Sequence, residues 1–198
     1  MTLSRLILAA ALAALPLSAC GRADEARNTG TANAVSNAAA PAAQPSGTLA
    51  AQLDHGDDMD TLHDLARNAG LDDVLGGVGP YTLFAPTDAA FAALGDERVN
   101  ALKSAAMRPQ AMALLRAHIV PGLVTNRDLD AALANAGGRP VRMRTMGAGT
   151  LTFAREGGAI VVTADGARAR LAGTETIATN GAIHPIDALL LPTEPAGQ

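Results

Sequence analysis

The stretch "NGAIHPIDALLLP", Asn180 to Pro192, comes just before the end of the 198-residue chain. Its Asn-Gly pair is typical of a tight hairpin turn, because both residue types tolerate a positive φ. Ile183 and Ile186 then reach into the core from a closing strand that also carries the polar His184. Pro185 cannot donate a ladder hydrogen bond, so an edge or a bulge is expected at this point of the strand.

The composition indicates one globular domain with appendages, since 48% of the residues are hydrophobic and 17% are charged. The chain has no Trp, one Tyr and three Phe, so few aromatic side chains are present to stack on bases. With a formal net charge of -4, the chain also lacks the broad positive charge that general nucleic-acid binding needs. Nucleic acid is therefore excluded as a partner.

The first twenty residues, "MTLSRLILAAALAALPLSAC", combine one early arginine, an apolar stretch and small residues before a cysteine. This pattern predicts a signal peptide over residues 1–19. The segment Leu17–Cys20 resembles the bacterial lipobox, in which the cysteine is lipidated, so Cys20 is the expected lipidation site. An ordinary secretory leader with a chance cysteine is the alternative.

The segment 20–47 after the leader is rich in Ala, Asn, Ser, Gly and Pro and almost devoid of large apolar side chains. It cannot bury enough surface to offset its ordering entropy, so a disordered tether is expected there. A folded domain over 48–192 follows, and 193–198 is a short tail.

The first half of the domain has helical periodicity around one short strand. In "YTLFAPTDAAFAAL", Tyr81–Ala85 is predicted to form a buried strand. Thr87 then caps a helix whose Asp88 favours the positive N-terminal end. A later helix begins at Pro109 and places His118 near its C-terminus, where the helix dipole favours the protonated imidazole.

An acidic segment, "DHGDDMDTLHD" (54–64), contains residue types that bind metals. Its spacing matches neither a zinc signature nor a calcium loop. Helix capping explains it better, with Asp60 as the N-cap of a helix that ends before Gly70. We therefore expect no metal and no other cofactor.

The second half changes to short, alternating or β-branched segments separated by Gly-rich turns, such as Gly157-Gly158 and Asp165-Gly166. "RPVRMRTM", "TLTFARE", "AIVVTADG" and "ARARLAGTETIAT" are predicted to be antiparallel strands. Because helices precede strands instead of alternating with them, the fold class is α+β.

Arginines alternate with apolar or small residues on three of these strands. They are Arg142, Arg144, Arg155, Arg168 and Arg170. A stripe that binds an anionic polysaccharide or lipopolysaccharide is one interpretation. The other is a solvated sheet face whose charge is balanced by Glu156, Asp165 and Glu175.

Three stretches, in this order and spacing, together resemble the fasciclin (FAS1) domain. "YTLFAPTDAAFAAL" is similar to its first motif, "LLRAHIVPG" to its central Tyr-His segment and "TNGAIHPIDALLLP" to its closing motif. The resemblance covers about 48–192. It implies a compact α+β unit, a β-sheet wedge with helices packed against it. It also implies a secreted or membrane-anchored module for adhesion or matrix binding.

Two residues depart from the family pattern. Ala117 stands where the central motif usually has Tyr, and Pro185 stands where an aliphatic residue is commoner. The first departure leaves open whether any adhesive role of the Tyr-His pair applies to this chain.

Two classes of function follow from this sequence. Nucleophilic catalysis by His184 would need a serine or cysteine partner, yet the lone cysteine is the lipidation site and no Gly-x-Ser-x-Gly elbow exists. The motif residues are therefore expected to hold the fold, and Asp88, His118 and His184 could meet as one hydrogen-bonded set.

The favoured function is a non-enzymatic, lipid-anchored binding or adhesion module of the bacterial envelope. The alternative is a hydrolase or small-ligand carrier that uses these three residues in a cleft.

The expected location is the cell envelope, facing the periplasm or the surface. Gly21 follows Cys20, where an Asp would retain a lipoprotein in the inner membrane of some bacteria, so the outer membrane is favoured. The expected partners are the membrane, through the lipid, and an envelope or extracellular protein or polysaccharide.

Overall fold

The computed structural model describes residues 45–191. The predicted signal peptide, the Cys20 lipidation site, residues 20–44 of the tether and the 193–198 tail lie outside the described residues. The mixture of helices and sheets confirms the predicted α+β class.

Seven α-helices and one 3-10 helix lie within the described residues. The helices are α1 (Leu49–Asp54), α2 (Asp60–Ala69), α3 (Asp72–Gly76), α4 (Asp88–Ala92), α5 (Asp96–Lys103), η1 (Ala105–Met107), α6 (Arg108–Ala117) and α7 (Asn126–Asn135). The strands are β1 (Tyr81–Pro86), β2 (Ile119–Pro121), β3 (Val141–Arg144), β4 (Thr150–Glu156), β5 (Ala159–Ala164), β6 (Ala167–Arg170), β7 (Thr176–Ala178) and β8 (Gly181–Ile186).

The strands form two sheets of four. Sheet A has the order β2-β1-β8-β7, and sheet B is the antiparallel meander β3-β4-β5-β6. Within sheet A, β1 and β8 are parallel neighbours over their whole length, from Tyr81↔Gly181 to Pro86↔Ile186. The segment "ARARLAGTETIAT", predicted as one strand, divides into β6 of sheet B and β7 of sheet A.

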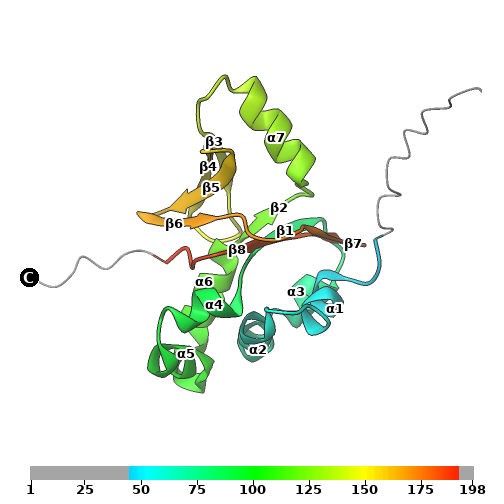
Figure 1. Ribbon diagram of the computed structural model, residues 1–198. Coiled ribbons are helices and arrows are strands. Elements are labelled where there is room, and N and C mark those ends of the chain that lie inside the picture. Colours follow the sequence, from blue (N-terminus) through cyan, green and yellow to red (C-terminus); the bar gives the residue numbers. More distant parts are fainter. Residues whose placement is uncertain (1–44, 192–198) are drawn as a thin grey trace, which may run out of the picture. The chain divides into compact units, whose positions relative to one another are not determined.

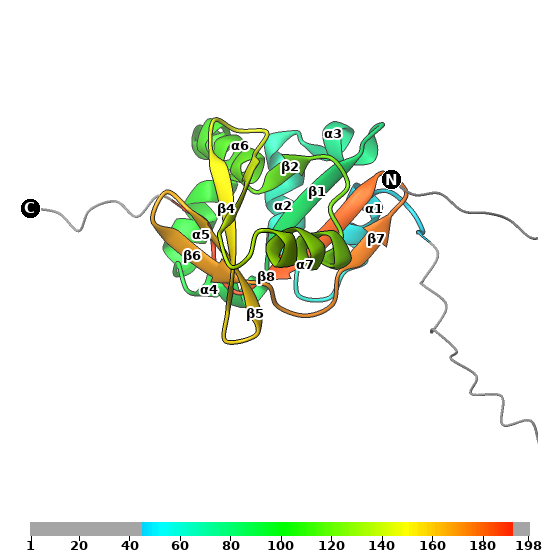
Figure 2. The same ribbon diagram turned by 90° about the horizontal axis from the view of Figure 1, so that it is seen from above.

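Sheet A is the middle layer of the domain (Figure 1). Helices α1 to α6 lie on one side of it, and sheet B with α7 lies on the other. The view from above shows α7 crossing over β1 and β8 (Figure 2). Each side has its own core. Leu83 and Ile183 belong to the helical core, whereas Phe84 and Ile186 belong to the core under sheet B.

Strand β1 is apolar almost without interruption because both of its faces are covered. Residues 82–86 are all buried. A strand that alternated apolar and polar residues would expose a polar face to one of the two cores. The sequence "TLFA" is therefore suited to the central position that β1 takes.

The turn before β8 differs from the predicted one. The register Ala178↔Gly181 makes Thr179 and Asn180 the two turn residues and Gly181 the first residue of the strand. Neither Asn180 nor Gly181 has a positive φ, so the prediction that this pair supplies one was wrong. Both residues instead make close contacts with other segments, as described below.

Strand β8 lies inside sheet A, yet at Pro185 one of its sides has no strand partner. Proline is tolerated there, as it is on an edge strand. Strand β7 pairs only with Gly181, Ala182 and Ile183, so it has ended before Pro185. The Pro185 carbonyl accepts a hydrogen bond from Ala172 N at 2.8 Å, on the side away from β1. The nitrogen of a strand residue faces the same side as its carbonyl, so the missing N–H removes no bond to β1.

Between residues 45 and 191, no helix combines the length and the hydropathy that a membrane-spanning helix requires.

Candidate functional site

Thr87 and Asp88 join two helices at the end of β1. Thr87 is the N-cap of α4, as predicted, and its Oγ1 accepts a hydrogen bond from Ala90 N at 3.3 Å. The Asp88 carboxylate turns to α2, where it accepts hydrogen bonds from Asp60 N at 3.3 Å and Thr61 N at 2.9 Å. Asp60 is therefore the first residue of α2 and not its N-cap. Met59 occupies the N-cap position and makes no capping bond through its side chain.

Asn180 ties the β7–β8 turn to two helical segments. Its Oδ1 accepts a hydrogen bond from Leu49 N, and its Nδ2 donates to the carbonyls of Leu75 and Gly77, each at 2.8 Å. Only 9% of Asn180 is exposed, so a lost partner here would leave a buried polar group unsatisfied. Asn180 is thus a side-chain clamp on α1 and α3.

His118 ends α6 as a buried, neutral imidazole. Its Nδ1 donates to the Leu114 carbonyl at 2.8 Å, and its Nε2 accepts from Leu190 N at 3.1 Å. Burial lowers the pKa of His118 to about 4, and the bond to the Leu114 carbonyl offsets only part of this effect. The prediction that the helix dipole favours a protonated His118 was wrong, because desolvation outweighs the dipole at a site with 1% exposure.

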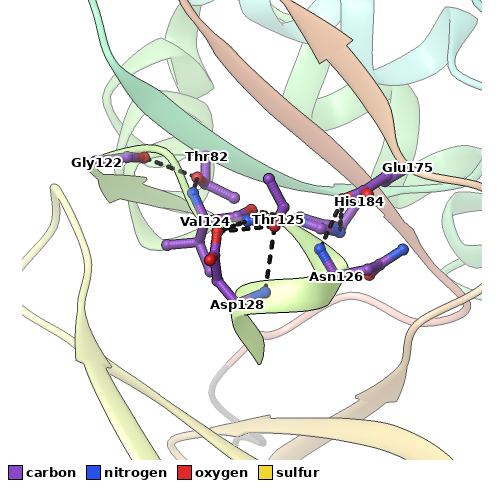
Figure 3. Close-up of polar contacts among 8 residues, drawn as sticks. All are labelled: Thr82, Gly122, Val124, Thr125, Asn126, Asp128, Glu175 and His184. Atoms are coloured by element: carbon purple, nitrogen blue, oxygen red, sulfur yellow. Dashed lines mark hydrogen bonds and ion pairs between the residues drawn. The ribbon is translucent and has the colours of Figure 1, made fainter. Parts of the chain in front are cut away.

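His184 lies on β8 in a second, separate polar network (Figure 3). Its Nε2 donates to the Val124 carbonyl at 2.7 Å, and its ring stacks on Phe84 with centroids 5.2 Å apart. The Nδ1 atom lies 4.0 Å from the Glu175 carboxylate. Burial lowers the pKa of His184, although the bond to Val124 and the Glu175 charge act in the opposite direction.

Thr82 and Glu175 complete this network, which positions the segment leading into α7. The Thr82 hydroxyl donates to the Gly122 carbonyl at 2.7 Å and accepts from Val124 N at 2.8 Å. Glu175 accepts a hydrogen bond from Asn126 N, the first residue of α7, at 2.7 Å. Sequence reasoning missed Thr82 in this role, although a lone threonine in an otherwise apolar buried strand was an available signal.

Asp88, His118 and His184 do not form one hydrogen-bonded set, so that expectation was wrong. Each is bound to a different backbone segment, namely the start of α2, residues 114 and 190, and residue 124. The physical reason is that each side chain meets a different neighbour: Asp88 on α4 faces the start of α2, and His118 ends α6 beside Leu190. His184 instead faces the core under sheet B, where it stacks on Phe84. The geometry therefore assigns each of these side chains a bond that holds the fold, and not a place in a shared cleft.

His184→Ala is expected to lower the free energy of unfolding by about 1–3 kcal/mol, because the Val124 carbonyl loses its partner in a buried site. Urea unfolding of the variant and the wild type measures this difference. His55→Ala, which removes an exposed imidazole, is the matched control and is expected to change little. Equal stability of His184→Ala and the wild type would contradict the role described above.

Four arginines lie on one exposed face of sheet B, which we call the arginine face. The register places Arg142, Thr152, Thr163 and Arg168 in one row across the four strands. Opposite residues of antiparallel strands share a face, and so do residues two apart on one strand. The arginine face is therefore made of Arg142, Arg144, Arg168 and Arg170, all of them exposed.

Arg155 does not belong to the arginine face. Thr152 points to the arginine face, whereas Arg155 points to the opposite face of β4, together with the buried Phe153. Helix α7 covers that face, and the Arg155 side chain forms an ion pair with Asp130 of this helix. The prediction of a five-arginine stripe is corrected to four, because the pleat directs successive side chains to opposite faces.

The carboxylates expected to balance these charges do so only in part. Glu156 forms an ion pair with Arg168, but Glu175 is turned to α7 and His184. Among the described residues, Arg142, Arg144 and Arg170 have no carboxylate within ion-pair distance. The arginine face therefore keeps an excess of positive charge in a chain whose formal net charge is -4.

The acidic segment at 54–64 is divided among separate partners. His63 lies 3.7 Å from Asp54, and Asp64 bonds Lys103 of α5 at 2.9 Å. Within residues 45–191, His, Cys, Asp and Glu side chains do not gather in a group that could hold a metal ion.

The fold and these motifs define a fasciclin-type module, with two sheets, a helical layer and a closing strand inserted beside the first strand. The profile of the fasciclin domain family matches residues 57–192. The chain therefore belongs to the fasciclin domain family, whose domains are cell-adhesion and binding modules.

Individual relatives share the same region. Protein sll1483 of Synechocystis sp. is 33% identical over 132 residues, which are 67% of this chain and 66% of that protein. The transforming growth factor-beta-induced protein ig-h3 of Sus scrofa is 29% identical over 137 residues, which are 69% of this chain and 18% of that protein. The chain thus spans less than two thirds of the length of these relatives.

A solved structure shares the fold. The pair of FAS1 domains from the insect cell adhesion molecule fasciclin I superimposes with a TM-score of 0.64 and 21% sequence identity. The superposition covers 74% of this chain and 51% of the insect one.

Proposed function

We propose that the protein is a lipid-anchored, non-enzymatic binding module of the bacterial envelope that holds an anionic envelope polysaccharide on its arginine face. The domain family supports the binding role, and the lipobox-like segment ending at Cys20 supports the anchor. The non-enzymatic part rests on the two buried imidazoles. Both nitrogens of His118 are bonded to backbone groups, and His184 bonds a carbonyl from within the core.

One observation carries the choice of surface, namely that three arginines of the face have no carboxylate partner within the described part of the chain. Guanidinium groups present several donors in a planar fork that matches carboxylate and phosphate oxygens. Thr152 and Thr163 lie between Arg142 and Arg168 in the same row, so hydroxyl groups accompany the charges. Such an arrangement suits a sugar chain that carries acidic groups and hydroxyls.

Replacing Arg142 and Arg144 together by Gln is expected to weaken binding to immobilised lipopolysaccharide about 30-fold. Each basic residue near an anionic surface contributes about 1 kcal/mol, and a tenfold change in affinity corresponds to about 1.4 kcal/mol. Surface plasmon resonance at low and moderate salt measures the effect, with neutral dextran as the reference surface. Arg127→Gln with Arg139→Gln removes the same charge outside the face and is the control. Equal losses in both double variants would refute a localised site.

Cys20→Ser is expected to abolish membrane anchoring, because one or two acyl chains supply the proposed attachment. The variant should appear in the soluble envelope fraction or retain its leader, whereas the wild type partitions into detergent. Mass spectrometry of the N-terminus reports processing independently. A processed variant that stays in the detergent phase at the wild-type level would show that Cys20 is not the anchor.

Purified protein should also lack hydrolytic turnover on ester, amide and glycoside substrates. Turnover that disappears in His184→Ala, while the variant remains folded, would reverse the non-enzymatic assignment in favour of a hydrolase.

A further inference from the structure

An apolar pocket of about 270 Å³ lies between α6 and the end of sheet B. We call it the α6 pocket. Its walls are the apolar side chains of Leu114, Ala117, Leu151, Ala164 and Leu190. Leu151 and Leu190 are at most 2% exposed, so the base of the pocket is part of the core under sheet B.

Small residues on α6 create this space. Ala113 and Ala117, one helical turn apart, both line the pocket, together with Gly149 from the β3–β4 connection. Neither helix position has a side chain beyond Cβ with which to fill the volume. A cavity of about 150 Å³ already holds benzene in another protein, so this volume admits a ring larger than benzene.

Backbone hydrogen bonds join the β3–β4 connection, which supplies Thr145 and Gly149 to the pocket, to the end of α6 and to β2. Gly147 N donates to the Arg116 carbonyl at 3.0 Å, and Met146 N donates to the Ile119 carbonyl at 2.7 Å. Thr145 N donates a hydrogen bond to the Gly149 carbonyl at 3.1 Å, which closes the turn between β3 and β4. The pocket is therefore a preformed feature between two fixed segments.

Among the described residues, Asp165 is the one charged side chain that lines the α6 pocket. Arg116 and Arg142 line neighbouring hollows that also include Asp165. Asp165 lies in the β5–β6 turn, it is exposed, and it has no ion-pair partner among the described residues. A carboxylate accepts hydrogen bonds and repels anions. Within residues 45–191, the lining thus combines one carboxylate with the neutral polar side chains of Gln110, Thr145 and Thr150, and the carboxylate favours an occupant with a hydrogen-bond donor and disfavours an acid.

We propose that the α6 pocket binds a small aromatic molecule of one or two fused rings, with its ring against Leu114, Leu151 and Leu190 and its N–H or O–H group donating to Asp165. The apolar ring leaves water for a poorly hydrated site, and the donor gives the orientation. This site adjoins the arginine face, since Asp165 also lines a shallow hollow with Arg142. Its test uses an uncharged ligand and does not depend on the proposed function.

Indole is the probe, in an NMR titration of the full chain carrying Cys20→Ser, so that no acyl chain competes for the pocket. Saturable shifts are expected at the amides of Ala117, Gly149 and Leu190, with a Kd of about 0.1–1 mM for a ligand of this size. Benzoate, a ring that carries an anion, should bind at least roughly tenfold more weakly, because its charge meets Asp165. Absence of saturable shifts at these amides, or equal binding of benzoate and indole, would overturn the proposal.

Two variants locate the ligand. Ala117→Leu fills the pocket and should abolish the indole shifts, whereas Ala101→Leu adds the same side chain to exposed α5 and should leave them intact. Ala113→Leu is the second filling variant, at an exposed position that tolerates a larger residue. Unchanged indole binding in a folded filling variant would overturn the site.

Asp165→Asn tests the donor contact and keeps the positive φ of 47°, which Asn adopts readily. This variant should bind indole about tenfold more weakly and bind toluene, which lacks a donor, as the wild type does. An equal change for both ligands would refute the contact with Asp165.

Discussion

Gly181→Ala is expected to destabilise the domain by about 4 kcal/mol or more, or to prevent folding altogether. A Cβ atom at this position would lie 1.9 Å from the Tyr81 carbonyl oxygen and 2.9 Å from Leu49 Cδ1. The first contact is with backbone, so no rotamer change relieves it. Strands β1 and β8 would have to separate at Tyr81↔Gly181, the first pair of their ladder. Overpacking of a core usually costs about 1–3 kcal/mol, and a clash between backbones exceeds that range.

Gly76→Ala is the matched control for this prediction. Gly76 is the last residue of α3, it has no positive φ, and an added Cβ would meet nothing closer than Ala50 Cβ at 3.9 Å. The free energy of unfolding of the Gly76→Ala variant, measured in urea, should stay within about 1 kcal/mol of the wild-type value. Gly181→Ala protein that folds with wild-type stability would show that β8 does not approach β1 this closely.

The stability of the domain is expected to fall as the pH is lowered from about 6.5 to about 4, chiefly because of His118. Its pKa is lowered from 6.5 to about 4 in the folded protein. Above pH 6.5 the imidazole is neutral in both states. Between the two values the unfolded chain binds the proton and the folded one does not, so protons favour unfolding. Integrated over this window, the loss is on the order of 3 kcal/mol.

Protonation of His118 also creates a direct conflict in the folded state. Its Nε2 accepts a hydrogen bond from Leu190 N, and a proton on Nε2 would bring two donors together. His184 adds to the loss in the same direction, because burial lowers its pKa as well.

Urea unfolding at a series of pH values measures this dependence. His118→Asn, already less stable at neutral pH, should show a flatter profile between pH 6.5 and 4, whereas His55→Gln should retain the wild-type slope. NMR titration of the wild-type protein measures the pKa of each imidazole directly, so this test does not require a folded variant. A His118 resonance that titrates near pH 6.5 in the folded protein would contradict the prediction.

The local elements were largely predictable because local chemistry produces them. Thr87 caps α4 as its position after β1 suggested, and the capping box of Thr125 and Asp128 forms at the start of α7. Strands β4, β5 and β6 of sheet B are separated by the Gly-rich turns predicted at Gly157-Gly158 and Asp165-Gly166. Each of these features depends on residues a few positions apart, and its physical cause is backbone conformation or a nearby side chain.

The roles of the motif residues were less predictable, since each depends on a partner far along the chain. Asp88 was assigned to its own helix, but it caps α2, 27 and 28 residues earlier in the sequence. Asn180 was assigned to a turn conformation, but it bonds Leu49 across 131 residues. Arg155 was grouped with the other arginines, but the register of β4 and β5 places it on the opposite face.

The sequence by itself determined the α+β class, the family and the position of most helices and strands, because periodicity, caps and turn residues act over short distances. The tertiary structure decided that β8 lies parallel to β1 inside a sheet, and that two cores lie on either side of it. It also decided that His118 and His184 stay neutral and apart. Those outcomes depend on burial, which arises only when segments far apart in the sequence, such as His118 and Leu190 at a separation of 72 residues, are packed together and water is removed between them.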